Sequence, residues 1–254
     1  MGKQKHFYLI RGLVREAHHW GVFPKHLREH FPDCKISFMD IPGAGELLFE
    51  KVPFTIEEMV DKMHQHYPVM VSEDFENHVI AVSLGAMIAL SWMKKRPHDF
   101  QGGYLINTSL GDLSPFYQRI KPKAFFKLAQ TLLLTGRKRE EQILKVVTNS
   151  PLKKELLELC EQIAKERPVT WESTLRQLIA ASRFRLGLWK PAIPLYLLSS
   201  TKDKMVSIQC SRRLAKAWDV PLIEHPTAGH ELADEDPLWT VERILELGTR
   251  QREF

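Results

Sequence analysis

The sequence predicts an α/β fold, with a mainly parallel sheet of about six strands flanked by helices. Along most of the chain, short apolar runs alternate with amphipathic helical patterns, which is typical of parallel strands joined by right-handed crossovers. One run, residues 78–82, is apolar and rich in β-branched residues, as expected for a strand buried on both faces. The alternation stops at about residue 115 and resumes near residue 191, which indicates a helical insertion.

The strands and helices of the predicted sheet domain follow in order. Strands are expected at residues 7–10, 34–39, 78–82, 103–107, 194–199 and 221–225. Helices are expected at residues 20–31, 55–67, 87–93, 207–218 and 237–247. The helix at 55–67 opens with a capping-box pattern from Thr55 to Glu58, and a glycine-rich loop, 40–45, follows the second strand. The core is therefore predicted to consist of residues 1–114 and 191–254.

Residues 115–190 are predicted to form the helical insertion, with helices at 123–134, 139–147, 153–166 and 170–185. This stretch holds 16 Lys and Arg against 7 Asp and Glu, whereas the rest of the chain holds 20 against 24. The insertion therefore has a net charge of +9 and the rest of the chain −4, so the excess of positive charge lies in the insertion. A solvated helical surface and a docking face for an anionic partner or substrate both explain this charge.

Composition excludes several classes of protein. With 44% hydrophobic and 26% charged residues in 254, the chain has the profile of a globular domain. No apolar run reaches the length of a membrane span, and the N-terminus lacks the apolar core of a signal peptide. Three distant cysteines, Cys34, Cys160 and Cys210, indicate reduced thiols and a cytoplasmic location. No metal-type spacing and no nucleic-acid-binding motif is found.

The stretch Ala81-Val82-Ser83-Leu84-Gly85 lies between a predicted strand and a predicted helix. A small-x-Ser-x-Gly sequence in this context is one residue away from the Gly-x-Ser-x-Gly turn that exposes a nucleophilic serine. The strand and helix pass close together there, so the residues two before and two after the serine must be small. A buried strand and helix with an incidental serine is the alternative.

A nucleophilic serine needs a base and an orienting acid, and both should lie at strand ends. Asp203 follows the predicted strand at 194–199, and His230 follows the last predicted strand. Their order along the chain, Ser, Asp, His, is the order expected in this type of fold. Each could instead be an ordinary exposed loop residue, but the joint match favours a catalytic triad.

With these residues, the chain resembles members of the α/β-hydrolase superfamily over about residues 7–247. The resemblance implies Ser83 as nucleophile, His230 as base, Asp203 as orienting acid and the insertion as a cap over the pocket. It also implies an oxyanion hole made by the backbone N–H groups of Leu13 and Leu84. The layout is most similar to small carboxylesterases of the pimeloyl-acyl-carrier-protein methyl ester esterase type.

The sequence departs from the superfamily pattern in three places. Arg11-Gly12 stands where His-Gly is usual, and Ala81 replaces a glycine. The antiparallel hairpin that often begins this fold is not expected. Arg11 is expected either to pair with an acidic neighbour such as Asp40 or to meet a substrate carboxylate. Arg11, Arg15 and Trp20 are the candidate substrate-binding residues.

The predicted activity is hydrolysis of a carboxylic ester through an acyl-enzyme, with no cofactor and no metal. Acyl-thioester hydrolysis, with acidic acyl carrier protein docked on the basic cap, is one alternative. A lyase of the menaquinone-pathway type acting on an anionic substrate is another, and a catalytically silent binding protein with this fold is a third. Neither a nucleic-acid partner nor a membrane span is expected.

Overall fold

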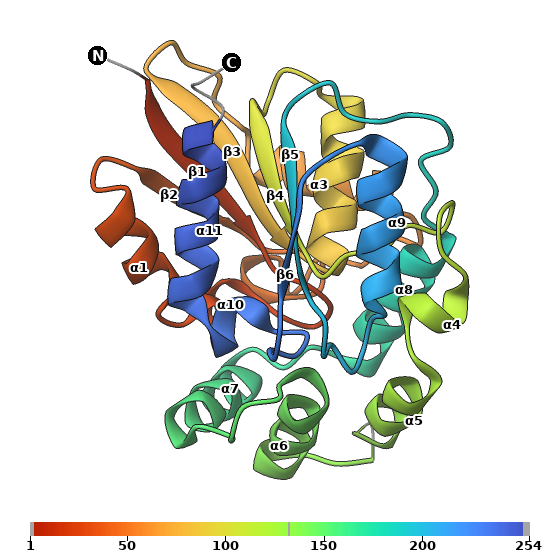
Figure 1. Cartoon of the computed structure of the whole chain (residues 1–254). Coiled ribbons are helices and arrows are strands. Elements are labelled where there is room, and N and C mark those ends of the chain that lie inside the picture. Colours follow the sequence, from red (N-terminus) through yellow and green to blue (C-terminus); the bar gives the residue numbers. More distant parts are fainter. Residues whose placement is uncertain (1–2, 132, 251–254) are drawn as a thin grey trace.

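A computed structural model describes residues 3–131 and 133–250 (Figure 1). Its sheet has six strands in the order β2-β1-β3-β4-β5-β6, and all five pairings are parallel. The strands are β1 (Gln4–Ile10), β2 (Lys35–Met39), β3 (Phe75–Val82), β4 (Gly102–Ile106), β5 (Leu195–Ser200) and β6 (Leu222–His225). This confirms the predicted α/β class and the six strands. Strand β3, which ends at Val82 directly before Ser83, is central and buried along most of its length, as its apolar sequence indicated.

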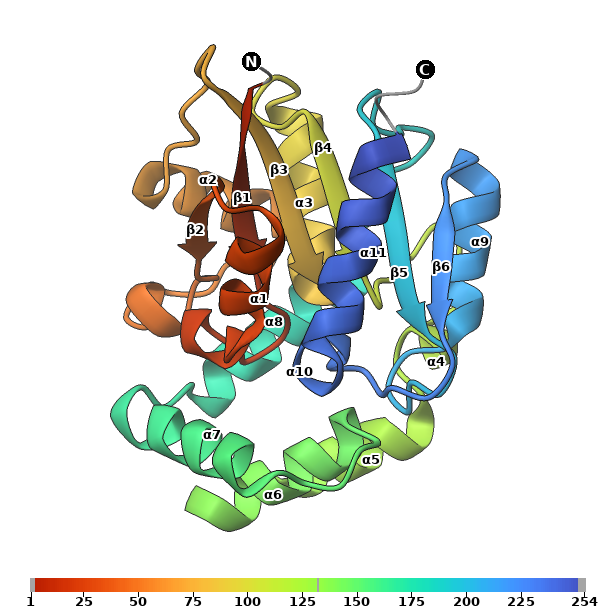
Figure 2. The ribbon, with the colours of Figure 1, turned by 60° about the vertical axis from the view of Figure 1, so that its left-hand side comes forward.

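Helices cover both faces of the sheet (Figure 2). On one face lie α2 (Ile56–His66), α3 (Leu84–Lys95) and α9 (Ile208–Trp218), and on the other α1 (Phe23–His30) and α11 (Pro237–Arg250). Alternate residues of a strand serve the two faces, as the pleat requires. In β1, Tyr8 and Ile10 join the core with α2 and α3, whereas Phe7 and Leu9 join the core with α1 and α11.

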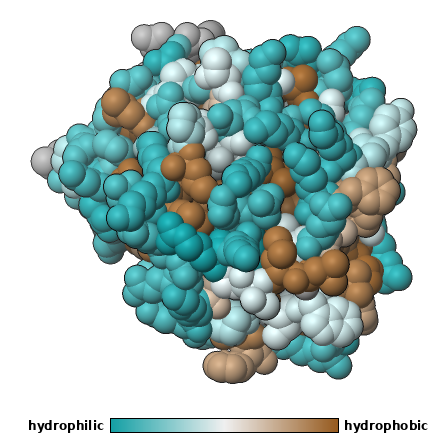
Figure 3. All heavy atoms as spheres, turned by 90° about the horizontal axis from the view of Figure 1, so that it is seen from below, coloured by the Kyte–Doolittle hydropathy of each residue, from teal (hydrophilic) through white to brown (hydrophobic). Residues whose placement is uncertain are grey.

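Five helices are inserted between β4 and β5, and we call them the inserted helices. They are α4 (Phe116–Arg119), α5 (Pro122–Thr131), α6 (Gly136–Val147), α7 (Lys154–Glu166) and α8 (Trp171–Arg183). Helices α5, α6 and α7 lie beyond the carboxyl ends of the strands (Figures 1 and 2). Seen from below, this end of the molecule shows hydrophobic patches among hydrophilic side chains (Figure 3).

The inserted helices share a small core of their own with the chain that follows β5. Ile143 and Leu144 of α6 and Leu157 of α7 belong to the same buried cluster as Met205 and Val206. Because Met205 and Val206 come directly after Asp203, this packing ties the inserted helices to the loop that carries the predicted acid.

Short elements were the ones that periodicity did not predict. These are α4, α10 (Leu232–Glu235) and the 3-10 helices Ala17–Trp20 and Gly45–Leu47. The helix predicted at 20–31 is in fact two segments, because Gly21 adopts φ +47° and separates the first 3-10 helix from α1. At α2, Thr55 Oγ1 accepts the N–H of Glu58 at 3.3 Å, which is one of the two hydrogen bonds of the predicted capping box.

Three predicted segments extend outside the described residues: the two ends of the core, residues 1–2 and 251–254, and residue 132 within the helix predicted at 123–134. Over the part of the chain that the structure describes, no helix is long and apolar enough to cross a membrane.

Candidate active site

Ser83 lies at the turn between β3 and α3 in a backbone conformation that non-glycine residues rarely adopt. Its φ is +55° and its ψ −114°. Such a conformation costs of order 1–3 kcal/mol and persists only where the surroundings impose it. Here the Ser83 N–H donates to Ile106 O at 2.8 Å, and Thr108 Oγ1 donates to Ser83 O at 3.1 Å. The end of β4 therefore holds the strained turn from both sides.

The close approach expected around the serine is present. A Cβ on Gly85 would lie 2.4 Å from Arg11 O and 2.6 Å from Ile10 O, which are backbone atoms of β1 and the loop after it. A Cβ on Gly12 would meet the Ser83 Cβ at 3.2 Å. Ala81 itself is fully buried, so its extra methyl group is accommodated. The small residues thus allow β1, the turn and α3 to pack against one another.

Asp203 and His230 lie in the loops after β5 and β6 and contact each other. His230 Nδ1 is 2.6 Å from Asp203 Oδ2, and both side chains are buried. The other oxygen of Asp203 accepts the N–H groups of Met205 at 2.7 Å and Val206 at 2.9 Å. Burial lowers the pKa of His230, but the charge and hydrogen bond of Asp203 outweigh burial and leave this pKa above its ordinary value.

The remaining ring nitrogen of His230 faces Ser83 across a small space. Among the described residues, Nε2 has no hydrogen-bond partner. Ser83 and His230 both line a cavity of about 30 Å³, together with Gly12 and Leu13. A buried water needs roughly 10–15 Å³, so this space holds about two water-sized groups. Such separation is common in unliganded hydrolytic sites, where the serine–histidine contact tightens on substrate binding.

Two backbone N–H groups, those of Leu13 and Leu84, belong to residues that line the cavity at Ser83 and have no acceptor among the described residues. Leu84 is the first residue of α3, so its N–H also lies at the positive end of that helix. The next N–H in the Leu13 loop, that of Val14, is held by Gln177 Oε1 of α8 at 3.1 Å.

A larger, mostly apolar cavity of about 260 Å³ opens above Ser83 and is bounded by the inserted helices. Its apolar lining includes Met87, Phe125, Leu178 and Val206. Enclosed ligand pockets usually measure about 300–1,000 Å³, so this one suits a small acyl or alkyl group.

Two of the three candidate substrate-binding residues, Arg11 and Trp20, lie away from Ser83. Arg11 pairs with acidic neighbours, which was one of its two expected roles, but these are Glu231 and Asp234 and not Asp40. It donates to Glu231 Oε2 at 2.7 Å and Asp234 Oδ2 at 2.8 Å, and its guanidinium lies over the Trp20 ring. Neither Arg11 nor Trp20 lines a cavity at Ser83. Arg15 lines the small cavity, but its Nη1 is bound to Glu140 Oε2 at 3.0 Å.

Asp40 instead organises the glycine-rich loop. Its carboxylate accepts the N–H groups of Ala17 at 2.7 Å and Glu46 at 2.9 Å. A Cβ on Gly45 would collide with this carboxylate, which explains the glycine there. Burial raises the pKa of Asp40 to about 6, although the two backbone hydrogen bonds oppose the shift.

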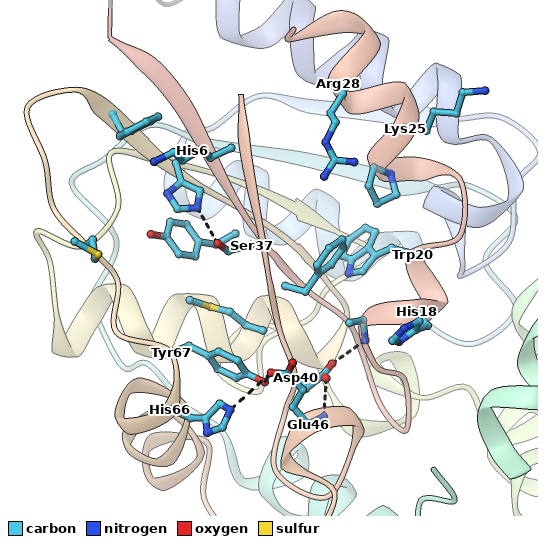
Figure 4. Close-up of a pocket in the computed structure, with 18 of the residues that line it drawn as sticks. His6, His18, Trp20, Lys25, Arg28, Ser37, Asp40, Glu46, His66 and Tyr67 are labelled. Carbon is cyan, nitrogen blue, oxygen red and sulfur yellow. Dashed lines mark hydrogen bonds and ion pairs between the residues drawn. The ribbon is translucent and has the colours of Figure 1, made fainter. Parts of the chain in front are cut away.

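A much larger cavity, about 1300 Å³, lies away from the serine, beside the edge strand β2 (Figure 4). Neither Ser83, Asp203 nor His230 lines it. Its polar groups largely bind one another: His6 Nε2 contacts Ser37 Oγ at 2.8 Å, and Tyr67 donates to Glu46 at 3.1 Å. Size therefore does not identify the reactive site. Among the described residues, no cluster of His, Cys, Asp and Glu is arranged to hold a metal ion.

Four residues of the site region were missed from the sequence: Asn107, Gln177, Glu231 and Asp234. Asn107 Nδ2 donates to His230 O at 2.8 Å and supports the histidine loop. Burial alone would raise the pKa of Glu231, but Arg11 and Arg15 hold this pKa below its ordinary value. The acidic residues directly after His230 were the available signal, because a buried Arg11 needs a carboxylate partner.

The parallel sheet, the strained serine turn and the buried Asp–His pair define an α/β-hydrolase. Residues 32–237 match the family described as serine aminopeptidase, S33, and the chain belongs to that family. No curated protein matches the sequence significantly.

Many solved structures share the fold at low sequence identity. An esterase from Exiguobacterium antarcticum is 13% identical, with a TM-score of 0.77, over 97% of this chain and 92% of that one. A lipase-esterase related protein from Clostridium acetobutylicum is 16% identical, with a TM-score of 0.72, over 96% and 95% of the two chains. A protein described as a non-heme bromoperoxidase from Mycobacterium tuberculosis is 19% identical, with a TM-score of 0.73, over 98% and 94%.

Proposed function

We propose that the protein is a serine hydrolase that cleaves a carboxylic ester through an acyl-enzyme. The observation that carries this proposal is the buried Asp203–His230 pair, whose free Nε2 faces the same cavity as Ser83. His230 Nε2 takes the Ser83 proton as the oxygen attacks the carbonyl carbon, and then protonates the leaving alcohol. Water, with His230 again as base, releases the acid.

The other parts of the site have roles that fit this reaction. The N–H groups of Leu13 and Leu84 stabilise the oxyanion of the tetrahedral intermediate, a contribution of about 3–4 kcal/mol per donor in related chemistry. Asp203 holds the His230 tautomer with its proton on Nδ1. The inserted helices form the cap that encloses the acyl or alkyl group.

An ester substrate is favoured over a peptide by the lining of the cavity. An aminopeptidase needs an acidic group for the substrate ammonium, and the described residues that line the 260 Å³ cavity include no Asp or Glu. Glu231 lines the smaller cavity, but it is bound to Arg11.

A thioester carried by an acidic acyl carrier protein is a second candidate substrate, because the inserted helices hold the excess positive charge. Lys123 and Lys127 are exposed one turn apart on α5, the inserted helix whose Phe125 lines the cavity. This arrangement would suit docking of an acidic carrier, and it is consistent with the narrower resemblance to pimeloyl-acyl-carrier-protein methyl ester esterases.

The proposal is tested with a fluorophosphonate probe and a panel of p-nitrophenyl esters, acyl thioesters and aminoacyl p-nitroanilides. The probe should label Ser83 and give no labelling in Ser83→Ala. That variant should lose ester turnover by several orders of magnitude while keeping the thermal midpoint of the wild type. An unlabelled wild-type protein without ester turnover would favour a silent binding protein, and turnover of a non-hydrolysable anionic substrate would favour a lyase.

A further inference from the structure

Arg119 is the one charged side chain among the described residues that line the 260 Å³ cavity above Ser83. It is the last residue of α4, and its side chain is only 8% exposed. Its Nε donates to Ser109 Oγ at 3.4 Å, Nη1 to Ser182 O at 3.2 Å and Nη2 to Ala181 O at 2.5 Å. A guanidinium is thus fixed in the wall of a mostly apolar cavity.

This buried cation lacks a carboxylate. Across residues 3–131 and 133–250, Arg119 forms no ion pair with Asp or Glu, unlike the buried Arg11 and Arg15. A second cation converges on the same place, because Arg185 Nη1 also donates to Ser182 O, at 2.9 Å. Burial and Arg185 lower the pKa of Arg119, and the charge of the nearby Asp112 opposes them in part. Asp112 accepts the Leu186 N–H at 2.6 Å and, within the described residues, forms no ion pair with Arg119, so no carboxylate is paired with this guanidinium.

The carbonyls of α8 hold the guanidinium but do not balance its charge. Ala181 and Ser182 lie in the last turn of α8, where the helix dipole supplies only about half a negative charge. Each Nη carries two N–H groups and each has one carbonyl partner, which leaves an N–H on both for a ligand. The Sδ of Met87, 3.9 Å from Nη2, is a weak acceptor. Charge-assisted hydrogen bonds from guanidinium N–H groups to a carboxylate are among the strong ones in proteins.

We propose that Arg119 binds an anionic group, a carboxylate in the first instance, on the part of the substrate that enters this cavity. The substrate is then an ester or thioester with an acidic group at some distance from the reacting carbonyl. This inference rests on the proposed function for its reaction, but the binding site for the anion stands on the geometry of Arg119 alone. It also moves the predicted contact with a substrate carboxylate from Arg11 to Arg119.

The kinetic experiment compares mono-p-nitrophenyl adipate with its methyl-capped diester, which is matched in length but neutral. Wild-type protein should prefer the carboxylate substrate. Arg119→Gln should lower kcat/KM for that substrate by about 10- to 100-fold, mainly through KM, and should change the neutral one less than about 3-fold. Arg119→Lys should restore part of the preference. The control is Arg183→Gln, an exposed arginine of α8 that does not line the cavity.

A merely structural Arg119, needed to hold α8, would lower kcat/KM for both substrates equally, and that result would overturn the inference. So would a wild-type protein without preference for the carboxylate. Binding of monomethyl adipate and dimethyl adipate to Ser83→Ala, measured by calorimetry, separates the two proposals. Suppose that the wild type hydrolyses neither p-nitrophenyl substrate while Ser83→Ala binds monomethyl adipate more tightly than dimethyl adipate. If Arg119→Gln then removes this difference in binding, only the hydrolase proposal fails.

Discussion

At the scale of single residues, the hydrogen bonds of Asp203 and His230 restrict the orientation of both residues. Asp203 Oδ1 is occupied by two backbone N–H groups, so its other oxygen is directed at His230. The histidine is in turn fixed through its backbone by Asn107 and by Val147 O, 2.7 Å from its N–H. With Nδ1 engaged, Nε2 is the ring nitrogen left for the proton of Ser83.

Replacement of Asp203 by Asn should change both the rate and its pH dependence. His230 must be neutral to act as base, so wild-type kcat/KM should rise with pH through a pKa above 6.5. Asn removes the charge that raises this pKa while burial still lowers it, so the acid limb should move to lower pH. The wrong tautomer should lower kcat by about 10⁴-fold. A pH–rate profile tests this, and an unmoved acid limb would argue against His230 as base.

Gly85 should not tolerate a side chain. In Gly85→Ala the new Cβ meets two backbone carbonyls, which cannot move as a side chain could, so we expect destabilisation of about 1–3 kcal/mol. Gly248→Ala is the control, since its Cβ would meet only the Tyr104 hydroxyl, at 3.1 Å. Urea unfolding of the two variants measures the difference. Equal stability would contradict the close packing of α3 against β1.

The sequence was sufficient to predict that Ser83, Asp203 and His230 lie near one another, but it did not predict the residues around them. Parallel strands place their carboxyl ends at one edge, so a serine, an aspartate and a histidine after three strands converge whatever the details of packing. The partner of Arg11 depends on a contact across 220 residues, which no local pattern encodes. Likewise, Arg119 is one of 16 basic residues in the insertion, and only its burial distinguishes it.

At the scale of elements, the inserted helices are joined to the sheet domain by buried polar contacts as well as by apolar packing. Arg15 Nη1 contacts Glu140 of α6, and Gln177 of α8 bridges Val14 N and Pro42 O. Helical periodicity predicted the four long inserted helices, but the 4-residue α4, which carries Arg119, is too short to show a period. The contacts of α6 with Arg15 and of α8 with Val14 fix the loop after β1, which lies beside Ser83.

Neutralising Glu140 should therefore weaken the whole fold, because it leaves the buried Arg15 without its nearest carboxylate. Breaking one side of a buried pair costs about 3–5 kcal/mol, and we expect a loss of that order in Glu140→Gln. The adjacent Glu141 pairs with Lys145 on the exposed side of α6, so Glu141→Gln should show no measurable change. Denaturant unfolding compares the two variants. Similar midpoints would indicate that the Arg15–Glu140 pair does not hold α6 in place.

At the scale of the whole molecule, charge is divided between two parts. The sheet domain is slightly acidic and the inserted helices are strongly basic, and residues of both parts line the cavity above Ser83. A buried basic residue such as Arg119 acts on the substrate inside the cavity. The exposed lysines of α5 and α7 can act only on something larger outside it, within a Debye length of about 8–10 Å.

Charge reversal on the inserted helices should therefore affect a carrier-bound substrate and spare a small one. Lys123→Glu/Lys127→Glu on α5 should lower kcat/KM for an acyl group on acidic carrier protein by about 10-fold or more at low salt, because steered association depends on such charge. The same reversal at Lys153 and Lys154 should have a smaller effect, because α7 does not line the cavity. Hydrolysis of a small p-nitrophenyl ester should be unaffected.

The matched control reverses the charge of Lys25 and Lys216, which are exposed outside the inserted helices. Rates with the carrier-bound substrate that do not change with ionic strength would mean that the basic surface is only a solvated face.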